Sequence, residues 1–150
     1  MERDDIIEVL NDLIENSRDG QQGFNTCAEH VKSPELRDIF LARASACAAA
    51  VSELQVLVSE CGGTPDDSGS ISGAMHRGWV AMRGTLSGYT DVGMLEECER
   101  GEDVAKARYE KALSRPLPEP IRAVVERQYQ GVLRNHEQVK LLRDRYRTAV

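Results

Sequence analysis

Apolar residues recur every three or four positions through most of this chain, and that spacing limits its fold more than any other feature. Such spacing puts apolar side chains on one face of an α-helix and polar ones on the other. The clearest run is Leu36, Phe40, Ala44, Cys47, Val51, Leu54, Val58 and Cys61. Aromatic residues make up only 5% of the chain, which also favours helix over strand. The sequence therefore predicts an all-α fold.

The runs and their interruptions predict four long helices, over about residues 5–31, 34–61, 92–114 and 119–147. Ser33 is a favourable N-cap and Pro34 suits the first position of the second helix, while Gly62 and Gly63 suit its end. Residues 64–70 are turn formers and predict a loop. A shorter helix is expected over about residues 71–86, where glycines weaken the apolar pattern.

The lengths of the connections predict how the helices are arranged. The first and last connections are short, so each joins two antiparallel neighbours, whereas residues 62–90 are enough to cross the length of a bundle. A long crossover between two antiparallel pairs is typical of a ferritin-like, up-down-down-up four-helix bundle. We therefore expect one domain over residues 1–150, with the short extra helix in the crossover. An up-down-up-down bundle with the same helix as a strut is the alternative.

Charge and composition narrow the classes of function. The formal net charge of −6 argues against binding to a phosphate backbone, which depends on clustered Lys and Arg. No uninterrupted apolar run approaches the roughly 20 residues that span a bilayer, and the acidic N-terminus lacks the pattern of a secretory signal. We expect a cytoplasmic protein that binds neither nucleic acid nor membrane.

The four cysteines are widely spaced, at Cys27, Cys47, Cys61 and Cys98. No pair has the close spacing that is usual in zinc sites. We interpret them as reduced thiols that act as small apolar side chains on helix faces. A metal site shared by all four thiolates is the weaker alternative.

Residues 95–103, LEECERGED, concentrate carboxylates in the middle of a predicted helix. On a helical wheel Glu99 and Glu102 share the face of Leu95, Cys98, Tyr109 and Leu113, which should face a core. Glu96, Glu97 and Asp103 fall on the solvent side. Buried carboxylates need partners, so this stretch is the best candidate for a functional site.

Counting residues outward from Leu117 places Glu99 beside His136 and Glu102 within one turn of Gln128. In the crossover topology Arg43 lies at the same level. The first interpretation is a polar network, in which Arg43, Gln128 and His136 satisfy the two carboxylates.

The second interpretation is a divalent metal site for Fe, Mn or Zn. Its ligands would be Glu99, Glu102 and His136, with Glu15 or Glu53 as outside candidates. Arg43 argues against it, because a fixed cation competes for the carboxylates. The Glu-x-x-His pairs of di-iron bundles are also missing from the sequence.

Several strings resemble a known family: residues 11–24 (NDLIENSRDGQQGF), 69–79 (GSISGAMHRGW) and 98–113 (CERGEDVAKARYEKAL), together with His136-Glu137. They resemble the bacterial ferritin-like four-helix-bundle family of unknown function, over about residues 6–144. The resemblance implies a ferritin-like bundle from a bacterium and implies no established activity or cofactor.

The HRGW string within the crossover suggests a second cluster. Trp79 should cover the bundle surface, and His76 and Arg77 could then reach Glu15 or Asp19 on the first helix. We predict that this clamp of opposite charges holds the crossover against that helix. The alternative is an ordinary packing tryptophan, with Glu15 and Asp19 on a solvated face.

Taken together, these features favour a structural or protein-interaction module over an enzyme. Its core would hold a polar cluster, its protein partner is unknown, and its slim Ala-rich second helix favours a homodimer. A metal-binding or redox protein is the alternative. A binding protein for an apolar small ligand between the helices is a third interpretation, which no particular residue supports.

Overall fold

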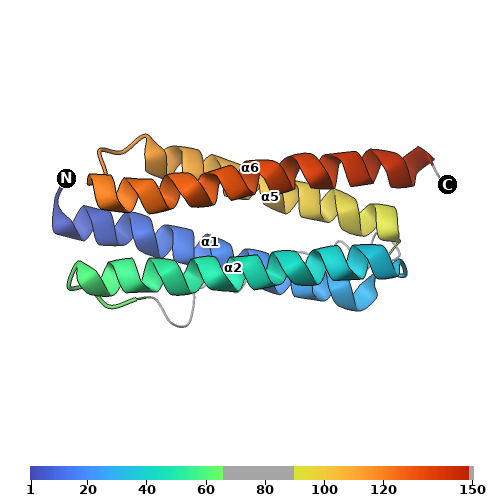
Figure 1. Ribbon diagram of the computed structural model, residues 1–150, viewed down its shortest axis with the longest axis horizontal. Helices are drawn as coiled ribbons and strands as arrows, with labels where there is room; N and C mark the ends of the chain where they lie inside the picture. The colour runs from blue at the N-terminus through green and yellow to red at the C-terminus, as the bar shows by residue number, and fades with distance from the viewer. Residues whose placement is uncertain (66–89, 149–150) are drawn as a thin grey trace.

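The computed structural model describes residues 1–65 and 90–148, and the described part of the chain is helical with no strand. The helices are α1 (Arg3–His30), α2 (Pro34–Glu60), α5 (Asp91–Leu113) and α6 (Glu119–Thr148). Figure 1 shows them as four long rods that lie side by side. The all-α prediction is confirmed, and each of the four expected helices is present within about two residues of its expected ends. The extra helix expected over residues 71–86 lies outside the described residues.

Local capping explains where the helices begin and end. The Ser33 hydroxyl accepts a hydrogen bond from the Leu36 amide at 3.2 Å, and Pro34 follows as the first residue of α2. Gly62 ends α2 with a φ of +81°, a conformation that costs glycine little. At the start of α5, the Asp91 carboxylate accepts from the amides of Lys32 and Ser33, at 2.8 and 3.1 Å. Asp91 therefore ties α5 to the turn between α1 and α2.

Replacing Ser33 by alanine should lower the free energy of unfolding by about 1 kcal/mol. The substitution removes the cap of α2, and it also removes the 2.8 Å contact between the Ser33 and Tyr146 hydroxyls. Urea denaturation measures the loss. Ser45→Ala, at an exposed position within α2, is the control and should change stability by less than about 0.5 kcal/mol. Equal effects of the two substitutions would mean that the cap contributes nothing.

The core consists of two apolar clusters, one toward each end of the molecule. The first joins the beginning of α1 and the end of α2 to the Tyr109–Val132 region of α5 and α6. The second joins the end of α1 and the beginning of α2 to the start of α5 and the end of α6. This pairing, which Figure 1 also shows, means that α1 and α6 run in one direction and α2 and α5 in the other.

The α2 helix is less buried than its composition suggests. By length and composition alone it is apolar enough to cross a membrane, with a mean hydropathy of 1.3 over its most apolar 18 residues. Only 22% of that window is buried inside the molecule. One face of α2 therefore presents apolar and small side chains outward.

Candidate functional site

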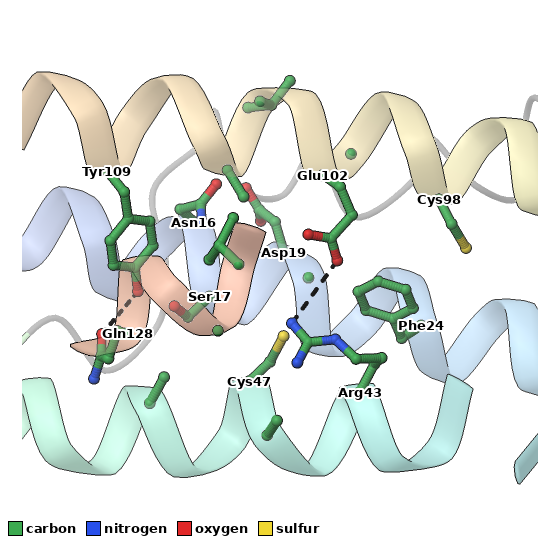
Figure 2. Close-up of a pocket in the computed structure, with 18 of the residues that line it drawn as sticks. Asn16, Ser17, Asp19, Phe24, Arg43, Cys47, Cys98, Glu102, Tyr109 and Gln128 are labelled. Atoms are coloured by element: carbon green, nitrogen blue, oxygen red, sulfur yellow. Dashed lines mark hydrogen bonds and ion pairs between the residues drawn. The ribbon is translucent and has the colours of Figure 1, made fainter. Parts of the chain in front are cut away.

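Small residues meet at the middle of the bundle and leave a cavity between the two apolar clusters. All four helices contribute them: Gly20 from α1, Ala46 and Ala50 from α2, Gly101 and Ala105 from α5, and Gly131 from α6. The space they leave has a volume of about 430 Å³. We call it the waist cavity, and Figure 2 shows the side chains that line it.

Glu102 is the most deeply buried charged residue in the cavity wall, with 3% of its surface exposed. Its carboxylate accepts a hydrogen bond from the Asn135 side-chain amide. The Arg43 guanidinium lies across the cavity, with Nη2 at 3.8 Å from Glu102 Oε1. Figure 2 shows the two side chains pointing toward each other from α5 and α2. They form an ion pair that is too long to be a hydrogen bond.

The pKa of Glu102 is raised from its usual 4.5 to about 7. Burial is the largest cause, because it disfavours the charged carboxylate. Arg43, the Asn135 hydrogen bond and His136 oppose the rise but do not cancel it. Glu102 therefore changes its charge near neutral pH.

Some polar atoms of this cluster have no hydrogen-bond partner within the described part of the chain. They are Glu102 Oε2, Arg43 Nε and Asn135 Oδ1. Arg43 is otherwise stacked near Phe24, with its guanidinium carbon 5.8 Å from the ring centroid. A buried donor or acceptor without a partner costs about 1–3 kcal/mol. The cluster is thus left open to a group that both donates and accepts hydrogen bonds.

A second polar chain lines the other end of the cavity. The Tyr109 hydroxyl donates to Gln128 Oε1 at 2.7 Å, and the Gln128 amide donates to Glu53 Oε1, also at 2.7 Å. Glu53 is also paired with Arg127. Burial raises the pKa of Tyr109 to about 12. Its hydroxyl therefore stays protonated near neutral pH and acts only through hydrogen bonds.

All four cysteines are free thiols, and Cys47 and Cys98 line the waist cavity. The Sγ atoms of Cys27 and Cys98 are 3.4 Å apart between α1 and α5. Burial raises the pKa of Cys98 well above 9 and that of Cys47 to about 11. Cys47 and Cys98 therefore pack as small protonated side chains, as the sequence predicted for them.

The structure brings together Arg43 and Glu102 but not the whole predicted layer. Glu99 pairs with Arg143, and His136 contacts Asp103. Among residues 1–65 and 90–148, no group of three or more His, Cys, Asp or Glu could hold a metal ion. The predicted set of Glu99, Glu102 and His136 is therefore not assembled at one point in this structure. Binding of Fe, Mn or Zn by the chain stays a prediction.

Two further expectations have mixed outcomes. Glu97 was expected on the solvent side, but it is 7% exposed and accepts from Arg100 at 3.1 Å. The expected surface positions of Glu96 and Asp103 are confirmed.

Asp19 is buried in the cavity wall and Glu15 is half-buried, which does not fit a fully solvated face. Their predicted clamp partners His76, Arg77 and Trp79 lie outside the described residues, so the clamp stays a prediction.

Sequence reasoning overlooked the residue that meets Glu102. Asn135 directly precedes His136, and only the register of α5 against α6 decides which of the two reaches the carboxylate. The cavity was also not foreseen, although glycine or alanine at the middle of every helix was a signal for it.

A family model matches residues 5–115, which include α2, α5 and all but the first two residues of α1. The chain belongs to the family described as Domain of unknown function (DUF2383). No curated protein matches its sequence. Arg43, Glu102 and Tyr109 lie within the part of the chain that matches the DUF2383 model, whereas Gln128 and Asn135 of α6 follow it.

Proposed function

We propose that this protein is a ligand-binding module, rather than an enzyme, which holds a small organic molecule in the waist cavity. The observation that carries the proposal is a cavity of about 430 Å³ whose wall contains buried polar atoms without a hydrogen-bond partner in the described structure. Pockets for small molecules usually measure 300–1,000 Å³ and combine an apolar lining with a few polar groups. The waist cavity has both properties.

The side chains of the wall indicate the chemistry of the ligand. Phe24, Val104 and Val132 offer apolar surface for the body of the molecule. Arg43 can only donate hydrogen bonds, while an ionised Glu102 can only accept them. A head group that both accepts and donates, such as a primary amide, would satisfy both residues at once.

The wall reaches the surface along α6, which offers a route into the cavity. Arg127 and Arg134 line the cavity and are both exposed. Burial keeps the Tyr109 hydroxyl and the Cys47 thiol protonated near neutral pH, which supports binding over covalent catalysis by these two groups.

We also propose that the helices have the ferritin-like, up-down-down-up connectivity. The opposite directions of the α1–α6 and α2–α5 pairs support it, as does the long stretch between α2 and α5. The cavity lies midway between the ends of such a bundle, where bundle proteins build their binding sites from facing helices.

Benzamide and toluene are suitable probes, because they share a ring and differ in the polar head. We expect benzamide to raise the melting temperature in a concentration-dependent way, because a ligand that binds only the folded state stabilises it. Toluene should raise it less, because it leaves Arg43 and Glu102 unsatisfied. Thermal unfolding across a series of probe concentrations measures both effects.

Ala105→Leu tests whether the probe occupies the waist cavity, because Ala105 lines it. This variant should lose the response to benzamide. Ala107→Leu, at an exposed position of the same helix, is the matched control and should keep it. The proposal fails if benzamide leaves the melting temperature unchanged, or if Ala105→Leu and Ala107→Leu respond alike.

A further inference from the structure

The outward face of α2 carries a continuous line of exposed residues, separate from the waist cavity. We call it the α2 outer stripe: Asp38, Leu41, Ala42, Ser45, Ala49, Ser52, Val56 and Ser59. Its members recur every three or four positions, so they lie along one side of the helix. Leu41 is 47% exposed and Val56 is 56% exposed, which makes them two of the few large apolar side chains at the surface of the described structure.

The stripe is nearly symmetric about its own midpoint. Leu41 and Val56 lie equally far from the point between Ala48 and Ala49, on opposite sides of it, and so do Ser45 and Ser52. If a second α2 packed antiparallel across a twofold axis at this point, small residues would meet at the centre. Leu41 of each copy would then be level with Val56 of the other. A twofold interface needs this kind of self-complementary patch.

Shape and charge fit the same arrangement. A hollow lined by Ser52, Gln55, Val56, Ser59 and Glu60 lies at one end of the stripe, where the Leu41 side chain of a second copy would arrive. The Arg37 guanidinium donates to the Ala28 and Val31 carbonyls at 3.4 Å, which holds it at the start of α2. Arg37 and the exposed Glu60 lie equally far from the midpoint of the stripe, so opposite charges would face each other at both ends. Antiparallel packing additionally opposes the two helix dipoles.

We infer that the α2 outer stripe is a homodimer interface, in which two copies of this chain pack α2 against α2 in antiparallel orientation. The small residues at its centre let the two helix backbones approach closely. Serines, Asp38 and the charged ends suit a protein partner better than a lipid surface, which favours large apolar side chains. The inference is independent of ligand binding in the waist cavity.

The size of the contact indicates a reversible dimer. The 27 residues of α2 extend over about 40 Å, and a helix is about 10 Å wide, so this face offers roughly 400 Å² per copy. That is about half of a standard interface of about 800 Å² per partner. We therefore expect the dimer to dissociate within the concentration range of sedimentation experiments.

Analytical ultracentrifugation across a concentration series tests the inference. The wild-type chain should shift from monomer to dimer as its concentration rises, and Ala49→Arg should remain monomeric because it brings two like charges together at the twofold axis. Ala123→Arg, at an exposed position of α6, is the matched control and should dimerise like the wild type. Circular dichroism checks that both variants keep their helix content.

The charged ends provide a test of orientation. Glu60→Arg should weaken the dimer about tenfold, because it would face Arg37 of the second copy, and the double variant Glu60→Arg with Arg37→Glu should restore it. A wild-type chain that stays monomeric at every concentration overturns the inference. So does a monomer that co-sediments with phosphatidylcholine–phosphatidylglycerol vesicles through the same stripe, because the face would then bind lipid. A dimer that Ala49→Arg leaves intact uses another surface and equally overturns it.

Discussion

Replacing Glu102 by glutamine should stabilise the protein at neutral and alkaline pH, by up to about 3 kcal/mol. Glutamine keeps the shape of the protonated carboxyl group and cannot take a charge. The wild-type side chain must ionise at high pH in a site where burial has raised its pKa from 4.5 to about 7. That rise corresponds to about 3 kcal/mol of stability that the ionised form lacks.

The sign of the pH dependence follows from proton binding. Between pH 4.5 and about 7 the folded wild type keeps the proton on Glu102 while the unfolded chain has released it. The stability of the wild type therefore falls as the pH rises through this window and then levels off. Glu102→Gln removes this fall, so the two proteins should be about equally stable near pH 4 and differ most above pH 7.

Urea denaturation of both proteins at several values between pH 4 and pH 8 measures the difference. Glu137→Gln, at an exposed position of α6, is the control and should follow the wild type at every pH. A constant offset between Glu102→Gln and the wild type would show that Glu102 does not titrate in this window.

The sequence was sufficient to predict the helices, because their signals are local. The Ser33–Pro34 start of α2 and the glycine at position 62 act within one turn of the residues they affect. The apolar spacing also identified which face of each helix is buried. These features depend on neighbouring residues and need no knowledge of the partner helix.

The register of α5 against α6 could not be read from the sequence, because it depends on the shape of the turn between them. Counting from Leu117 put Glu99 beside His136. The observed pairs are Glu102 with Asn135 and Asp103 with His136, which is about one helical turn further along α6. One turn is enough to change every polar partner, and it separates the carboxylates that were expected to share one imidazole.

The waist cavity also could not be predicted from the helices taken one at a time. Gly20, Ala50, Ala105 and Gly131 are each unremarkable on their own helix. They leave a space only because the packing brings them to one level, while larger residues such as Leu10, Leu54, Phe40 and Met94 fill both ends. A helical wheel shows which way each side chain faces. A cavity also depends on how far along each of the four helices the small residues lie.

Replacing Arg43 by methionine should make the protein progressively less stable above pH 7. Arg43 is the largest of the influences that hold the pKa of Glu102 down. Without this cation the carboxyl group should stay protonated in the folded state to a higher pH, so the fall in stability continues where the wild type has levelled off. Each unit by which the pKa of Glu102 rises above its wild-type value adds about 1.4 kcal/mol to the loss at alkaline pH.

The loss of stability in Arg43→Met depends on the ionisation of Glu102. A double variant that also replaces Glu102 tests this dependence. Near pH 6 the wild-type carboxyl group is already mostly neutral, so Arg43→Met should lose little there through electrostatics. In Arg43→Met combined with Glu102→Gln no carboxylate remains to ionise, and the extra loss between pH 7 and pH 9 should vanish. Urea denaturation of the four proteins at pH 6, 8 and 9 completes the cycle. The double variant could instead lose stability with pH as steeply as Arg43→Met alone. The pH-dependent loss would then not come from the ion pair between Arg43 and Glu102.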